Sequence, residues 1–113
     1  MDSIDMNRFG ELADEAFDLL PEDLQQAMEN VALFIDDTED LELLGLYDGI
    51  PLTERGIDYT AVLPDRIMIY RNSICAICET EAEIVEQVRI TVVHEVAHHF
   101  GIDDDALDEL GWG

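Results

Sequence analysis

The chain has 113 residues, of which 28 are acidic and five, all arginines, are basic, so that its net charge is −23. A chain of this length forms one domain rather than two, and its strong negative charge argues against binding to nucleic acids or to anionic membranes. No apolar run is long enough to span a membrane, and residues 1–10 lack the basic-then-apolar order of a signal peptide, so a cytoplasmic location is expected.

The N-terminal third of the chain predicts two helices and a strand. Residues 4–20 place apolar side chains at helical spacing between acidic ones, as in an amphipathic helix. Pro21 suits the first turn of a second, shorter helix that runs to about Glu29. The apolar residues 31–35, closed by two aspartates, predict a short buried strand.

The middle of the chain predicts a long loop and then a second strand. Glycines and prolines recur through residues 38–64, while the leucines and aromatic residues between them keep this segment packed on the domain. We interpret it as one ordered loop with room for a small hairpin. Residues 66–71 alternate between two kinds of face, which predicts a strand at the edge of the sheet.

The C-terminal part predicts a long helix. A single helical turn is expected over residues 73–78, and Thr80 with Glu83 makes a capping box that marks the start of the long helix. Valines and isoleucines give this helix a core face. Gly101 is a natural left-handed stop, which makes the helix about twenty residues long.

A short last helix is expected over about residues 103–110, and no repeat, linker or low-complexity tract divides the sequence. The order of the expected elements is two helices, a strand, a loop, a strand and two helices. This order predicts an α+β fold in which a small sheet of about two or three strands packs on the long helix. We expect a single domain over residues 1–113.

All three histidines of the chain lie in the second half of the long helix. His94 and His98 stand four residues apart, so that their imidazoles project from one face and can bind a single ion. Glu95 can reach a water on that ion and take its proton, as a catalytic base. This HExxH spacing predicts zinc, Zn²⁺, as the cofactor. The alternative is a pair of solvated histidines, but a chain with so few histidines rarely produces this spacing by chance.

A catalytic zinc site takes a third protein ligand besides two histidines. Gly101 lets the chain reverse after the helix, and the three residues that follow can bring Asp104 back under the ion. The neighbouring Asp103 and Asp105 are not excluded by spacing, and their alternative role is helix N-capping. The pattern is then HExxHxxGxxD, with both histidines and Asp104 as the metal ligands.

Residues 91–104 read TVVHEVAHHFGIDD and resemble the active-site helix of the small bacterial zincin-like metallopeptidases, also called mini-zincins. Residues 45–56 (GLYDGIPLTERG) and 63–67 (LPDRI) resemble the upstream signature of the same family. The resemblance therefore covers most of the chain, from about residue 31 to residue 112.

This resemblance implies a minimal zincin fold and a zinc-dependent hydrolase of peptide bonds. The motif positions match His94, His98 and Asp104 as zinc ligands and Glu95 as the catalytic glutamate. The implied substrate is a peptide or a protein.

The chain departs from the larger zincins in one respect. Metzincins follow their motif with a methionine turn beneath the metal, whereas all four methionines of this chain lie upstream of His94. Trp112 is the only large aromatic residue after the motif. It packs beneath the metal site or makes an ordinary core or dimer contact.

Three alternative interpretations stay open. Glu95 and His99 also stand four residues apart, which permits a shifted metal register, although a histidine in the last turn also suits the negative end of a helix. Cys75 and Cys78 combine with the two ligand histidines in the spacing of a structural Cys₂His₂ zinc site, but they also suit small core positions. The third interpretation is a metal-binding interaction module, or a degenerate peptidase, with little or no catalysis.

The negative charge bears on the partners of such a site. It attracts basic peptides and proteins as well as cations. The alternative is that the charge only keeps the surface solvated, as in the proteins of a high-salt proteome. The sequence leaves the oligomeric state open, a homodimer included.

Overall fold

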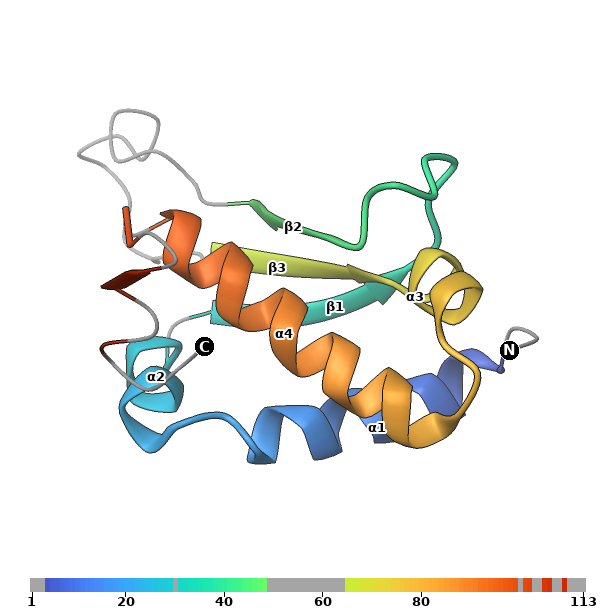
Figure 1. Cartoon of the computed structure of the whole chain (residues 1–113), viewed down its shortest axis with the longest axis horizontal. Coiled ribbons are helices and arrows are strands. Elements are labelled where there is room, and N and C mark those ends of the chain that lie inside the picture. Colours follow the sequence, from blue (N-terminus) through green and yellow to red (C-terminus); the bar gives the residue numbers. More distant parts are fainter. Residues whose placement is uncertain are drawn as a thin grey trace, which may run out of the picture.

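The computed structural model describes residues 4–29, 31–48, 65–99, 101–102, 105–106 and 109. Its helices are α1 (Met6–Asp18), α2 (Glu22–Ala27), α3 (Arg71–Ile77) and α4 (Glu81–His99). Its strands are β1 (Val31–Asp36), β2 (Gly45–Asp48) and β3 (Asp65–Tyr70). Figure 1 shows α4 lying across one face of the sheet, with α1 beside it. The prediction of an α+β fold with a small sheet packed on a long helix is confirmed.

The described strands form one sheet in the order β1–β3–β2. β3 pairs parallel with β1 and antiparallel with β2, so that Ile67 lies between Leu33 and Tyr47. β3 is therefore the central strand, and the prediction that residues 66–71 form an edge strand is wrong. Its alternating pattern arises because the described helices cover only one face of the sheet. The pattern therefore reflects a difference between the two faces and not an edge position.

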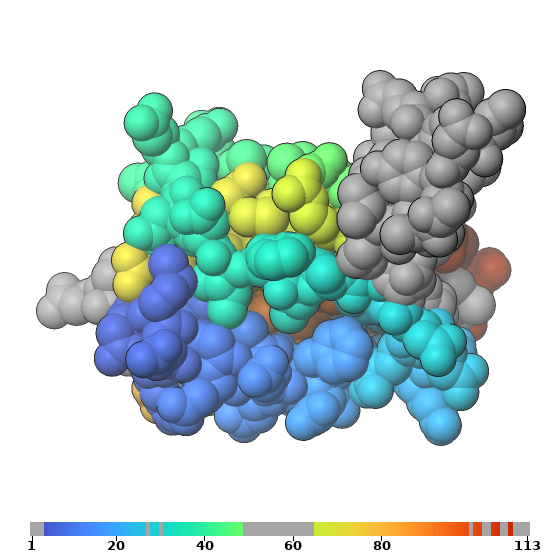
Figure 2. All heavy atoms as spheres, turned by 180° about the vertical axis from the view of Figure 1, so that it is seen from behind, coloured from blue at the N-terminus to red at the C-terminus, as the bar shows by residue number. Residues whose placement is uncertain are grey.

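β1 lies at an edge of the sheet, which corrects the prediction of a buried strand over residues 31–35. None of its six residues is fully buried. Phe34 is 47 % exposed and pairs with Met68, which in turn pairs with Leu46, 43 % exposed. Figure 2 shows β1 and β3 at the surface on this side, with no described helix over them. The apolar run of β1 thus contributes to a face that none of the described helices covers, as well as to the core.

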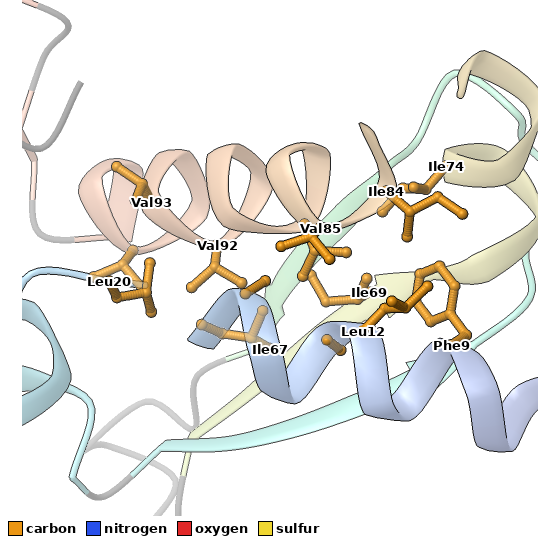
Figure 3. Packing of buried hydrophobic residues seen from close by; sticks show 14 of the residues in the cluster. Phe9, Leu12, Leu20, Ile67, Ile69, Ile74, Ile84, Val85, Val92 and Val93 are labelled. Carbon is orange, nitrogen blue, oxygen red and sulfur yellow. The ribbon is translucent and has the colours of Figure 1, made fainter. Parts of the chain in front are cut away.

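The covered face of the sheet and the helices enclose the hydrophobic core. Ile67 and Ile69 of β3 are 0 % exposed. Figure 3 shows side chains of α1, α4 and β3 pointing toward one another, among them Leu12, Val92 and Ile69. Because its inner face is held in this core, α4 presents its other face in a fixed orientation.

The other helices follow the predictions with adjusted bounds. Both N-terminal helices are present but shorter than expected, and Pro21 stands at the N-cap of α2 rather than inside it. The single turn expected over residues 73–78 is the seven-residue helix α3. The last helix, expected over residues 103–110, lies largely outside the described residues. None of the helices that the structure describes is long and apolar enough to cross a bilayer.

An ion pair joins α1 to the start of α4. Arg8 donates to the carboxylate of Glu81 from Nη2 at 2.8 Å and from Nε at 2.9 Å, and to Glu11 from Nη1 at 3.0 Å. The Arg8 guanidinium lowers the pKa of Glu81 below its ordinary value. Because the pair is exposed to solvent, it orients the two helices more than it stabilises them.

Candidate functional site

Helix α4, which carries the motif, begins at a capping box. Thr80 Oγ1 accepts a hydrogen bond from Glu83 N at 3.1 Å, as predicted. The Glu83 carboxylate accepts in return from Glu79 N at 3.0 Å, one residue further back than the expected partner. The cap fixes where the helix starts, and therefore which residues share each of its faces.

The chain leaves α4 through a Schellman turn, which has the left-handed glycine that the sequence predicts. Gly101 has a φ of +72°. Its N–H donates to His98 O at 3.2 Å, and the N–H of Ile102 donates to Ala97 O at 2.8 Å. Ile102 packs against the core. The chain thus reverses directly after the last turn of the helix, the turn that carries His98.

One side of α4 lines a groove, and its other side packs in the hydrophobic core. Gln87, Thr91, His94, Glu95 and His98 line a single groove. The ring centroids of His94 and His98 are 6.4 Å apart, and their planes differ by 28°. Both histidines are exposed, and Glu95 is half-buried beside them. The two imidazoles and the carboxylate are therefore presented to the same open space.

The facing wall of the groove is the segment Glu42–Gly45, which leads into β2. The groove has a volume of about 240 Å³. The sequence placed these residues only in a long loop, so it did not reveal this wall. The one signal in the sequence was that the segment resembling the family signature begins at Gly45.

Gly45 lets β2 lie directly against α4. A Cβ atom at this position would lie 2.6 Å from Thr91 Cγ2 and 3.0 Å from Met68 O. Thr91 is itself fixed, because it is buried and its hydroxyl donates to Gln87 O at 2.8 Å. The contact of Gly45 with Thr91 therefore sets the distance between the two walls of the groove.

His99 does not line the groove. Its ring stacks on Tyr47 of β2, with centroids 3.9 Å apart and 15° between the planes. Tyr47 OH donates to Asp65 Oδ2 at 2.8 Å, and His99 Nε2 lies 3.9 Å from the same oxygen. The structure thus gives no support to a shifted register in which Glu95 and His99 share an ion. His99 instead joins the end of α4 to the sheet.

The donors in the groove fit zinc by their chemistry. Imidazoles are ligands that catalytic zinc takes, and those of His94 and His98 line one groove with ring centroids 6.4 Å apart. Within the described part of the chain, no three histidine, cysteine, aspartate or glutamate side chains converge on one point. The predicted third ligand Asp104 lies outside the described residues, as do Asp103 and Trp112, and Asp105 is exposed.

The cysteines belong to the core and not to a metal site. Cys75 is 1 % and Cys78 3 % exposed, so both side chains are buried. Both cysteines, His94 and His98 are among the described residues, yet they do not converge. Burial raises the pKa of the Cys78 thiol, as an apolar surrounding does. The Cys₂His₂ alternative is therefore not supported.

Comparisons with known proteins extend these observations. The family model described as zincin-like metallopeptidase matches residues 16–112, which include both walls of the groove. A solved structure of a conserved hypothetical protein from Thermo thermophilus is similar, with a TM-score of 0.56 and 24 % identity over 86 % of this chain and 94 % of that one. At this identity the structural likeness concerns the fold alone. No curated protein matches the chain.

Proposed function

The chain belongs to the zincin-like metallopeptidase family, and on this basis we propose that it is a zinc-dependent hydrolase of peptide bonds. The observation that carries the proposal is the shared groove, in which His94, His98 and Glu95 face the same space. A helix that merely displayed solvated histidines would not need a second wall held against it.

We assign the metal ligands as His94, His98 and Asp104. The Schellman turn at Gly101 supports the third assignment, because it reverses the chain beside the last turn of α4. When bound, zinc supplies a positive charge that polarises the scissile carbonyl and acidifies water. The alternative carboxylates are Asp103 and Asp105.

Glu95 is the proposed catalytic base. Its carboxylate takes a proton from the attacking water as the carbon–oxygen bond forms, and gives it to the leaving nitrogen as the carbon–nitrogen bond breaks. Its half-buried position in the groove that the exposed histidines also line supports this role, because the carboxylate stays open to solvent.

The sheet offers a way to hold an extended substrate. Among the described strands, β2 pairs only with β3, so its other edge has no partner strand there. An extended peptide can add to such an edge through main-chain hydrogen bonds. The edge next to the groove belongs to β2, and not to the strand at residues 66–71 that the sequence suggested. The net charge of −23 favours a basic peptide.

Metal content and stability test the site. After the protein is loaded with zinc and excess metal is dialysed away, elemental analysis is expected to give one zinc per chain. Free zinc at a hundredfold excess over its dissociation constant is expected to stabilise the fold by about 2.7 kcal/mol. His94→Ala is expected to abolish both effects. His99→Ala is the matched control, because that ring stacks on Tyr47 outside the groove. Zinc retained at full stoichiometry by His94→Ala would exclude this site.

Hydrolysis is tested with a broad peptide library, with and without zinc. Glu95→Gln is expected to keep the metal and to lose all turnover, while Glu15→Gln, an exposed position on α1, is expected to change neither. Turnover that persists in Glu95→Gln would remove Glu95 from the mechanism. Zinc binding without cleavage of any library peptide would identify the chain as a non-catalytic metal-binding module.

A further inference from the structure

The wall that faces α4 is held rigidly in place. Ser73, which is fully buried, donates from Oγ to Leu43 O at 2.7 Å, and Tyr70 N donates to Leu44 O at 3.0 Å. Both carbonyls are therefore tied to the end of β3 and the start of α3. A wall fixed in this way can select a ligand rather than adapt to it.

The wall also has a definite direction along the helix. Gly45 lies against Thr91, and two residues later Tyr47 stacks on His99, so the wall runs the same way as α4. Glu42 comes three residues before Gly45 and also lines the groove. It therefore lies toward the N-terminal end of the groove, away from the end that carries His98.

This N-terminal end combines apolar surface with oxygen acceptors. Leu43 and Ile90 line it, together with Glu42 and Gln87. The Gln87 amide nitrogen donates to Thr91 Oγ1 at 3.3 Å, which leaves the amide oxygen as the acceptor of that side chain. An apolar stretch that ends at a carboxylate and an amide oxygen matches a long side chain with a cationic tip.

The protein does not neutralise Glu42 from within its described part. All four arginines described there form ion pairs with other carboxylates, namely Arg8, Arg66, Arg71 and Arg89. Glu42 is exposed, and its backbone N–H donates to Asp40 Oδ1 at 3.0 Å, which orients the turn that carries it. A cation supplied by a ligand would meet this carboxylate without competition from those four arginines.

We propose that Glu42 is a specificity-determining residue, and that the groove accepts an arginine or lysine side chain of a peptide beside the bond to be cleaved. The cleavage of a bond beside this side chain rests on the proposed function. The binding of the cationic side chain in the groove does not. The cation is placed at the Glu42 end because the positive charge of a bound metal ion lies at the His94–His98 end.

The test compares two alanine-rich peptides that are capped at both ends. The first has one central arginine, and the second has citrulline, the neutral analogue of arginine, at the same position. The wild-type protein is expected to prefer arginine in kcat/KM. Glu42→Gln is expected to lower this preference by about two- to fivefold, the range of an exposed ion pair. Glu39→Gln removes the same unit charge from an exposed position outside the groove, so it is expected to leave the preference unchanged.

Binding separates this inference from the proposed function. The same two peptides are titrated into zinc-loaded Glu95→Gln protein, followed by the chemical shifts of the Gln87 side-chain amide. Arginine-dependent shifts that disappear in the double variant with Glu42→Gln support the inference, even if the wild type cleaves no peptide. An equal preference in Glu42→Gln and wild type, or an equal loss in Glu39→Gln, would overturn it, because the preference would then come from the overall charge.

Discussion

Replacement of Gly45 by alanine tests whether the contact between β2 and α4 builds the groove. The new Cβ would lie 2.6 Å from Thr91 Cγ2, whereas ordinary contacts begin at 3.4 Å, so the two walls must separate by about 0.8 Å. The second close contact, with Met68 O at 3.0 Å, involves backbone that cannot rotate away. Overpacking of this kind costs about 1–3 kcal/mol.

Urea unfolding and thermal melting measure this cost. Gly45→Ala is expected to lower the urea midpoint without a change in slope, because the exposed surface on unfolding stays the same. The melting temperature is expected to fall by roughly 4 °C for each kcal/mol lost, as for a domain of this size. Zinc-dependent turnover is expected to fall as well, because the wall formed by residues 42–45 would lie farther from the residues of α4 that line the groove.

A double-mutant cycle decides whether Thr91 is the cause. Thr91→Ser removes the Cγ2 methyl and keeps the hydroxyl that donates to Gln87 O. The cost of Gly45→Ala is expected to fall by about 1 kcal/mol in the Thr91→Ser background, within the range for residues in contact. The recovery is partial because the clash with Met68 O remains. Additive costs of the two changes would refute the proposed contact.

A matched glycine is the control for that experiment. Gly10 lies inside α1, and a Cβ there would meet Ile35 Cδ1 at an ordinary 3.8 Å. Gly10→Ala is therefore expected to stabilise the protein by about 0.5–1 kcal/mol, because alanine loses less backbone entropy in a helix. The two glycine replacements should thus shift the urea midpoint in opposite directions.

Three further predictions follow from local geometry. Gly101→Ala is expected to cost about 1 kcal/mol through the left-handed φ alone, since nothing lies within 4 Å of the new Cβ, and to weaken zinc binding measured by titration. Arg8→Gln is expected to lower the urea midpoint at pH 7. Because the pKa of Glu81 is lowered in the fold, the difference in midpoint between the variant and the wild type should close as the pH falls through that pKa. A difference that persists at low pH would contradict this prediction. The Cys78 thiol is expected to resist a disulfide-exchange reagent until denaturant is added, because burial raises its pKa, so fast labelling of the native protein would be the contrary result.

Short-range signals in the sequence were enough to locate the helices α1, α2, α3 and α4 to within a few residues. The period of apolar residues, the Thr80–Glu83 cap and the left-handed Gly101 involve neighbours within about five residues, and they located α4 nearly residue by residue. The same helical period put His94, Glu95 and His98 together on one face, so this part of the candidate site could be predicted from the sequence alone.

The pairing of the strands and the wall that faces the histidines depended instead on long-range packing. An alternating strand looks the same at the centre of a sheet and at its edge, so the position of β3 depended on partners more than twenty residues away in sequence, at Val31 and Gly45. Neither the stacking of His99 on Tyr47 nor the place of Glu42 across from α4 has a local signal. Both arise because β2 packs on the helix through a glycine, and such contacts depend on the shape of the whole core.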